Sequence, residues 1–225
     1  MAHYLKYGNQ ELKVGLADEQ IKLVMEANHV ELPTGTFHAL IENALDNPIG
    51  TERIEDIVKP HEKVCIIISD STRSWQKPGM ILTVLLDRLG KAGVKDEDII
   101  IISARGSHRA QTVDELRFLV TDNIYDRIKV VDHNCTDEEN LTYLGTTSRE
   151  TPVKLNSIAV NSDHVILIGA VLHHFLAGFS GGRKNVIPGI AARDTIQANH
   201  KLALNDGIGS GGNPLVKSGQ LEGNP

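Results

Sequence analysis

The segment after Ala170 carries the densest set of side chains capable of chemistry. Two adjacent imidazoles, His173 and His174, precede the run Ser180-Gly181-Gly182-Arg183-Lys184. Histidine exchanges protons near neutral pH. Glycines let the backbone approach a ligand or adopt positive φ, so free amides can form an anion-binding nest beside the two cations. The segment therefore predicts a site that combines proton transfer with anion binding.

Two further polar clusters follow strongly apolar stretches earlier in the chain. The run Ser69-Asp70-Ser71-Thr72-Arg73 comes after residues 64–68, and residues 103–109, which include His108, come after residues 99–102. Because the carboxyl ends of parallel strands lie along one edge of a sheet, we expect all three clusters to meet at a single rim. We favour this interpretation over independent surface loops, since binding groups often lie on loops held by a rigid scaffold.

The hydrophobic pattern predicts the elements that would position these clusters. Continuous apolar runs indicate buried strands at 63–69, 98–104, 128–132 and 164–170. Stretches with helical periodicity occur at 36–47, 78–92, 112–120 and 195–204. Alternation around Gly8-Asn9-Gln10 predicts a β-hairpin over residues 3–16 that covers or extends a sheet edge. The expected fold class is α/β, a mostly parallel sheet with helices on both faces and an N-terminal β-hairpin.

Composition excludes several classes of protein. The formal net charge of -6 and the pI near 5.9 argue against a general nucleic-acid binder, because no basic stripe is available for phosphates. No stretch has the apolar length of a signal peptide or a membrane span. Two isolated cysteines, Cys65 in an apolar run and Cys135 in a polar loop, fit a reducing compartment. We interpret the chain as a cytoplasmic protein.

Four motifs in order resemble the amino-terminal domain of nickel-pincer lactate racemases and their 2-hydroxyacid racemase and epimerase relatives. The motifs are Asp70-Ser71-Thr72-Arg73, Arg105-Gly106-Ser107-His108, the segment from His173-His174 to Lys184, and Asn199-His200. The resemblance covers essentially the whole chain. It is specific to the superfamily and much less specific to the substrate.

The resemblance implies a cofactor, the nickel-pincer pyridinium-3,5-bisthiocarboxylic acid mononucleotide, joined covalently to Lys184 by a thioamide link. His200 would supply the protein ligand to nickel, and imidazole suits that metal as the cofactor's soft sulfurs do. The implied cofactor-binding residues are Lys184, Asp70, Thr72, Gly181 and Gly182. Cofactor-biosynthesis proteins would be partners of such a chain.

The resemblance also implies an isomerase that racemises a small lactate-like 2-hydroxy acid by reversible hydride transfer. His108 and His174 would flank the substrate as acid and base, and Arg73 would bind its carboxylate. Histidine suits this role because its ordinary pKa, roughly 6.5, makes both protonation states accessible. An arginine fork binds a carboxylate bidentately, which a lysine does less well.

Single residues also have simpler interpretations. Lys184 could be a non-covalent phosphate-binding lysine, His108 a solvated turn residue, and His200 the cap of a buried helix face. Arg105 and Arg109 could be surface charges. The run Asp132-His133-Asn134-Cys135-Thr136-Asp137 is interpreted as a polar loop, because its potential metal ligands are adjacent rather than spaced around an ion.

Two other functions compete with the racemase. One is a noncovalent nucleotide- or phosphate-binding α/β module, although the chain lacks both the GxxxxGK[ST] loop and a GxGxxG turn after its first strong strand. The other is a catalytically idle scaffold domain, which would leave three polar strand ends without a role. Neither alternative explains the order of the four motifs.

We expect residues 1–225 to be an N-terminal catalytic and cofactor-attachment domain that is truncated, since the chain stops on the turn dipeptide Asn224-Pro225. Members of the family are longer, with a second domain that closes over the cofactor. This part alone would turn over substrate poorly, because water exclusion would be incomplete. The identity of the 2-hydroxy acid and the oligomeric state are left open by the sequence.

Overall fold

The computed structural model describes residues 3–8, 10–24, 34–205 and 211–225. The chain divides into a small unit, residues 1–35, and a large unit, residues 36–225. Among the described residues, no helix is both long and apolar enough to cross a membrane.

The small unit contains the predicted β-hairpin. Strands β1 (His3–Tyr7) and β2 (Gln10–Val14) pair antiparallel, and the 3-10 helix η1 (Asp18–Gln20) follows. The cross-strand pair Leu5–Leu12 brings two apolar side chains together, and the pair Lys6–Glu11 brings opposite charges together. In the described part of the chain β1 and β2 form a two-stranded sheet; that this hairpin covers or extends a sheet edge stays a prediction.

The large unit is built on four parallel strands, all at the predicted places. They are β3 (Val64–Ser69), β4 (Ile99–Ala104), β5 (Lys129–Asp132) and β8 (His164–Ile168). Their order in the sheet is β5-β4-β3-β8. The chain therefore runs outward from β3 to β5 and then returns to the opposite side of β3. Open α/β sheets bind ligands where the strand order reverses in this way, here between the carboxyl ends of β3 and β8.

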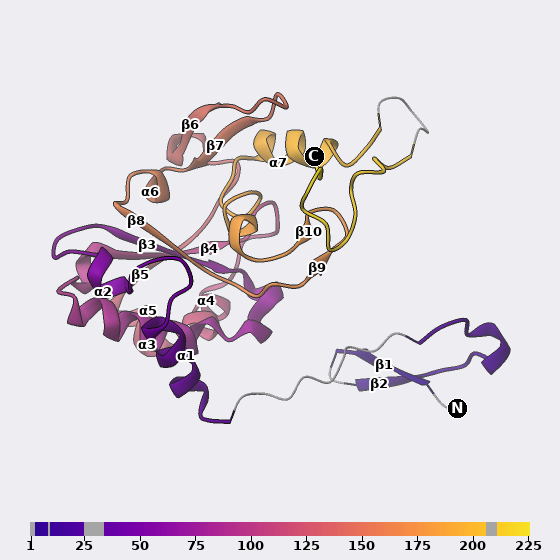
Figure 1. Ribbon diagram of the computed structural model, residues 1–225, viewed down its shortest axis with the longest axis horizontal. Helices are drawn as coiled ribbons and strands as arrows, with labels where there is room; N and C mark the ends of the chain where they lie inside the picture. The colour runs from indigo at the N-terminus through magenta and orange to yellow at the C-terminus, as the bar shows by residue number, and fades with distance from the viewer. Residues whose placement is uncertain (1–2, 9, 25–33, 206–210) are drawn as a thin grey trace. The chain divides into compact units, whose positions relative to one another are not determined.

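Helices cover both faces of this sheet, as Figure 1 shows. On one face lie α1 (Phe37–Asp46), α2 (Ile54–Ile57), α3 (Pro78–Lys91), α4 (Val113–Val120) and α5 (Asp122–Arg127). On the other lie α6 (Ser157–Val160), α7 (Arg193–Lys201) and the 3-10 helix η5 (Gly182–Asn185). The remaining 3-10 helices are η2 (Ser71–Gln76), η3 (Asp96–Asp98) and η4 (Glu138–Asn140). The predicted fold class is confirmed.

The sheet has two cores because successive side chains of a strand point to opposite faces. In β3, Val64, Ile66 and Ile68 pack with the apolar side chains of α3, α4 and α5. Cys65 and Ile67 point the other way and pack with residues of α6 and of the segment after η5. β3 is buried along its whole length, so its carboxyl end is a rigid support for the residues that follow.

Two hairpins in the described part of the large unit lie outside the central sheet. The hairpin of β6 (Leu141–Thr146) and β7 (Pro152–Asn156) was not predicted from the sequence, and its register shifts between Tyr143 and Gly145. The short strands β9 (His173–His174) and β10 (Gly178–Phe179) form a second hairpin directly after β8. Figure 1 shows β6 and β7 on the same side of the sheet as α7, and β9 and β10 beyond the carboxyl end of β8.

A buried histidine connects segments on the α7 side of the sheet by hydrogen bonds. His133 is 0% exposed; its Nε2 lies 3.0 Å from the carbonyl oxygen of Ala191, and its Nδ1 lies 3.2 Å from the side-chain nitrogen of Asn156. The carbonyl can only accept, so Nε2 carries the proton and Nδ1 accepts from the Asn156 amide. Both ring nitrogens are thus satisfied in the neutral state. Cys135, two residues on, is also buried despite its polar sequence neighbours, and both cysteines are free.

This arrangement predicts a pH dependence of stability. Burial, and to a smaller extent the charge of Arg105, lowers the pKa of His133. Below about pH 6.5 His133 is protonated in the unfolded chain but stays neutral in the folded chain. The contribution of His133 to the free energy of unfolding is therefore fully present above that pH and is lost as the pH falls. We expect His133→Gln to flatten the fall in unfolding free energy below about pH 6.5 by up to ~1.4 kcal/mol per pH unit. Urea unfolding at several pH values measures this, with the exposed His38→Gln as control. Equal slopes in all three proteins would contradict it.

Candidate functional site

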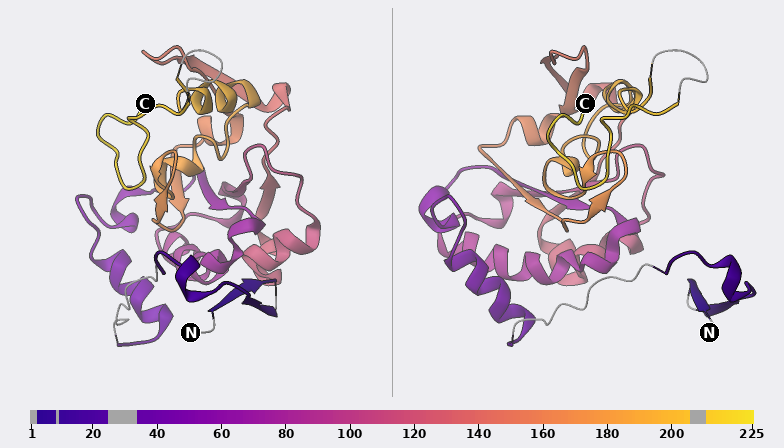
Figure 2. Two further views of the ribbon diagram at one scale, coloured as in Figure 1. Left: turned by 90° about the vertical axis from the view of Figure 1, so that its right-hand side faces the viewer. Right: turned by 45° about the vertical axis from the view of Figure 1, so that its right-hand side comes forward.

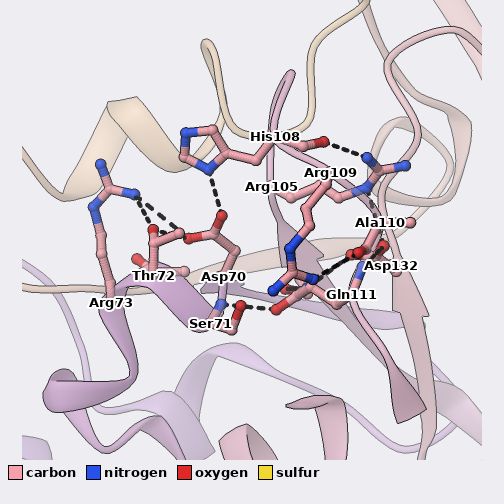
Figure 3. Close-up of polar contacts among 12 residues, drawn as sticks. Asp70, Ser71, Thr72, Arg73, Arg105, His108, Arg109, Ala110, Gln111 and Asp132 are labelled. Carbon is pink, nitrogen blue, oxygen red and sulfur yellow. Dashed lines mark hydrogen bonds and ion pairs between the residues drawn. The ribbon is translucent and has the colours of Figure 1, made fainter. Parts of the chain in front are cut away.

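An aspartate and a histidine meet at the carboxyl ends of β3 and β4. Asp70 follows β3 and is 2% exposed, and its Oδ2 lies 2.5 Å from Nδ1 of His108, in the loop after β4. The hydroxyl of Thr72 donates to the other carboxylate oxygen at 2.6 Å (Figure 3). A carboxylate only accepts, so Nδ1 of His108 carries the proton and Nε2 keeps its lone pair. In the neutral ring, Nε2 of His108 is thus able to accept a hydrogen bond or a proton.

A side-chain network joins the two loops that carry this pair. The side-chain oxygen of Gln111 accepts from the amide of Ser71 at 2.7 Å, and its nitrogen donates to Ser103 at 2.5 Å and to Asp132 at 2.7 Å. Figure 3 places Gln111 beneath both loops. The network ties the ends of β3, β4 and β5 together, which fixes the distance between Asp70 and His108.

Arg105 belongs to the same network and corrects one interpretation from the sequence. Its side chain is only 12% exposed, forms an ion pair with Asp132 at 3.0 Å, and donates to the carbonyl of His108 at 2.5 Å. It is therefore not a surface charge. Arg109 is one: it is 68% exposed and paired with Glu115.

The glycine-rich segment after β8 packs closely on the strand end. The side-chain nitrogen of Asn185 donates to the carbonyl of Ile168 at 2.8 Å. Gly181 has a φ of 75°, and a Cβ there would lie 2.6 Å from the carbonyl oxygen of Ala170. Only glycine fits such a position. The predicted positive φ is present at Gly178, Gly181 and Gly182, and the resulting turn starts η5, which carries Lys184.

Lys184 lies half-buried in this segment. Burial lowers the pKa of its amine, and the nearby charge of Arg73 lowers it further. A lower pKa increases the share of neutral amine, which is the nucleophilic form. The environment therefore suits a lysine that forms a covalent bond.

His174 is held in the opposite tautomer to His108. Its Nδ1 accepts from the backbone amides of Leu176 and Ala177, both at 3.1 Å. Nε2 must then carry the proton of the neutral ring. Burial lowers the pKa of His174, helped by the charges of Lys184, Arg73 and His200. Its neighbour His173 is exposed and makes an edge contact with the ring of Phe179.

His200 lies on α7 with one ring nitrogen free. Its Nδ1 donates to the carbonyl of Ile196 at 2.8 Å, one turn earlier on the helix. Nε2 of the neutral ring therefore keeps a lone pair, and many histidine metal ligands are oriented by a hydrogen bond of this kind from the other ring nitrogen. In the described part of the chain no three His, Cys, Asp or Glu side chains gather as a metal site.

The candidate residues converge on one cavity of about 300 Å³. Its lining includes the side chains expected to do chemistry: Arg73, His108, His174, Lys184 and His200. A larger, mainly apolar cavity of about 960 Å³ shares His174, Lys184 and His200 with the first. Gly181 lines both cavities and Gly182 only the larger one. Asp70 and Thr72 line neither; they lie behind His108 and Arg73, where Asp70 Oδ1 is 3.5 Å from the guanidinium.

Two curated relatives carry the name lactate racemase. The protein from Thermoanaerobacterium thermosaccharolyticum is 33% identical over 223 residues, which cover 98% of this chain and 50% of the relative. The protein from Lactiplantibacillus plantarum is 34% identical over 204 residues, which cover 87% of this chain and 46% of the relative. The chain thus spans about half the length of the curated relatives it matches.

Solved structures agree with this similarity. The lactate racemase apoprotein from Thermoanaerobacterium thermosaccharolyticum matches with a TM-score of 0.83 at 30% identity, over 100% of this chain and 51% of that one. A Thermotoga maritima protein matches with a TM-score of 0.65 at 24% identity, over 82% of this chain and 44% of that one, which shows the fold alone. The family model described as "Lactate racemase N-terminal domain" matches residues 7–211. Because that match takes in most of the sequence, the chain belongs to the lactate racemase N-terminal domain family.

Proposed function

We propose that this chain supplies the catalytic half of a racemase or epimerase for a lactate-like 2-hydroxy acid. The observation that carries the proposal is the convergence of Arg73, His108, His174, Lys184 and His200 on one cavity. The opposite tautomers of His108 and His174 give that cavity one proton acceptor and one proton donor. A site that interconverts mirror images needs both.

The residues present fit the nickel-pincer pyridinium mononucleotide that the family resemblance implies. Lys184, with its lowered pKa, would hold it covalently, and Nε2 of His200 would bind the nickel. Gly181 and Gly182 would place backbone amides near its anionic groups. The apolar cavity beside Lys184 offers room for a flat ring. When bound, this group would accept the α-hydrogen of the substrate as hydride and give it back.

The chain's own residues would then bind the acid and move one proton. Arg73, whose side chain is 37% exposed, would bind the carboxylate. Nε2 of His108 would take the hydroxyl proton, and Asp70 would stabilise the imidazolium that results. His174 would donate a hydrogen bond from Nε2–H to the same oxygen on the other side, and His108 would return its proton to that oxygen once the α-hydrogen is back on the carbon. We propose that Asp70 and Thr72 act by positioning His108 and Arg73, since neither lines the cavity.

This role of Arg73 predicts a change in substrate affinity. Arg73→Lys keeps the charge and loses the two-pronged contact, so we expect KM for the hydroxy acid to rise about tenfold while kcat changes little. Initial rates over a range of substrate concentrations measure both constants. Arg109→Lys, an exposed arginine paired with Glu115, is the control. An unchanged KM in Arg73→Lys would show that another group binds the carboxylate.

Protein from a host that makes the cofactor tests the proposal as a whole. Intact-mass and peptide mass spectrometry should find an adduct on Lys184 that is absent from Lys184→Arg, and chiral chromatography should show interconversion of D- and L-lactate or a related acid. An unmodified lysine that binds nucleotide reversibly would favour a noncovalent phosphate-binding module instead. Turnover that persists in Lys184→Arg would contradict the proposal. Proteins that make and load the cofactor would be partners, and two free cysteines accord with a cytoplasmic location.

A further inference from the structure

The last residues of the chain dock onto the hairpin that carries His174. We refer to residues 217–224 as the C-terminal strap; Figures 1 and 2 show this yellow segment beside β9 and β10. The amide of Gly219 donates to the carbonyl of Gly178 at 2.8 Å. A Cβ on Gly178, whose φ is 75°, would lie 2.1 Å from the carbonyl oxygen of Gln220. The contact is therefore close enough to require a glycine at position 178.

One side chain of the strap connects directly to the hydrogen bonds of His174. The side-chain nitrogen of Asn224 donates to the carbonyl of Leu176 at 3.1 Å. That carbonyl belongs to the same peptide group as the amide of Ala177, which donates to Nδ1 of His174 at 3.1 Å. A chain of two hydrogen bonds thus runs from Asn224 through one peptide group to the imidazole. Hydrogen bonds in series polarise and strengthen one another.

Asn224 is itself held in place from two sides. Its side-chain nitrogen also lies 3.3 Å from the carbonyl of Gln220, within the strap. Its own carbonyl accepts from the guanidinium of Arg149 at 3.1 Å. The strap is therefore held by hydrogen bonds at Gly219 and at Asn224, on either side of its contact with the hairpin.

We infer that Asn224 is a positioning residue, which fixes the peptide group between Leu176 and Ala177 and thereby holds His174 as its Nε2–H tautomer. Nothing in this step requires a cofactor or a substrate. Its catalytic consequence rests on the proposed function: a His174 that is free to change tautomer would present a proton donor for only part of the time. The strap would then serve the active site as well as the stability of the chain.

Histidine side-chain ¹⁵N NMR on the cofactor-free chain tests this inference. Asn224→Asp keeps the shape of the residue and removes the donor, and Asn224→Leu removes it without adding charge. In both variants we expect the share of the Nδ1–H tautomer of His174 to rise by up to about fivefold, the effect of losing the Ala177 hydrogen bond while the Leu176 amide still donates to Nδ1. His174→Gln assigns the signals. Gln220→Leu is the matched control, because the side-chain nitrogen of Gln220 donates to the carbonyl of Glu222, inside the strap.

A tautomer ratio that stays at the wild-type value in both Asn224 variants would overturn the inference. If either variant unfolds, amide hydrogen exchange at Ala177 in the other still reports whether the peptide group has been released. A missing Lys184 adduct would contradict the racemase proposal but would not change the tautomer ratio of the cofactor-free chain. The failure of one proposal can therefore be distinguished from the failure of the other. In cofactor-loaded protein the same variants should lose about fivefold in kcat with nickel content unchanged.

Discussion

Replacing His108 with alanine should lower kcat about a thousandfold in the cofactor-loaded protein while nickel stays bound. Of the two proposed acid–base histidines, His108 is the one whose Nε2 is left able to accept a proton, because Nδ1 faces the carboxylate of Asp70. His174→Ala should have an effect of the same size, since it removes the donor on the other side. Chiral chromatography measures the rate in both directions, and elemental analysis gives the nickel content.

His173→Ala is the matched control for these two variants. It removes an imidazole next to His174 that is exposed and lines neither cavity. We expect it to keep ordinary turnover. If His108→Ala and His174→Ala also kept ordinary turnover, the acid and base would have to be sought elsewhere. A loss of nickel in either variant would instead point to a role in binding the cofactor.

Asp70→Asn should reduce kcat by about a thousandfold although it changes one atom. The asparagine oxygen can still accept from Thr72, which leaves the side-chain nitrogen facing Nδ1 of His108. Two donors cannot bond to each other, so the imidazole would move its proton to Nε2 and lose its free lone pair. ¹⁵N NMR of the His108 side chain reports the tautomer directly, and steady-state rates report the consequence.

Asp56→Asn provides the comparison for the Asp70 variant. Asp56 is a half-exposed carboxylate of α2 that pairs with Arg53, away from the cavity, and its loss should change neither rate nor tautomer. Wild-type activity in Asp70→Asn would show that the carboxylate does not set the tautomer of His108. A full loss of activity with the Nδ1–H tautomer retained would assign Asp70 a different role.

The central sheet was predictable because its strands are nearly continuous apolar runs. β3 and β4 are rich in isoleucine and are buried on both faces, as such runs predict. β5 and β8 are less buried but carry the same β-branched pattern. The β6–β7 hairpin carried no such signal. Its strands are mostly half-exposed and mix polar with apolar residues, and Glu150, just before β7, turns the chain with a φ of 60°.

The candidate site residues could be selected from the sequence, and the hydrogen bonds that connect them could not. Arg73, His108, His174, Lys184 and His200 stand out by type and position, and all five line the same cavity. Gln111 gave no signal, because its role depends on contacts with Ser71, 40 positions away, and Asp132, 21 positions away. The tautomers of His108 and His174 likewise depend on partners that only the folded chain brings within reach.

The most direct test of the central claim follows the α-hydrogen of the substrate. Cofactor-loaded protein would be given L-lactate deuterated at the α-carbon in ordinary water, and the D-lactate formed would be analysed by mass spectrometry. If the cavity racemises by hydride transfer, the product keeps its deuterium, and unlabelled lactate takes up none from heavy water. Loss of the label to solvent at the rate of inversion would mean that the α-hydrogen leaves as a proton, which would contradict the account.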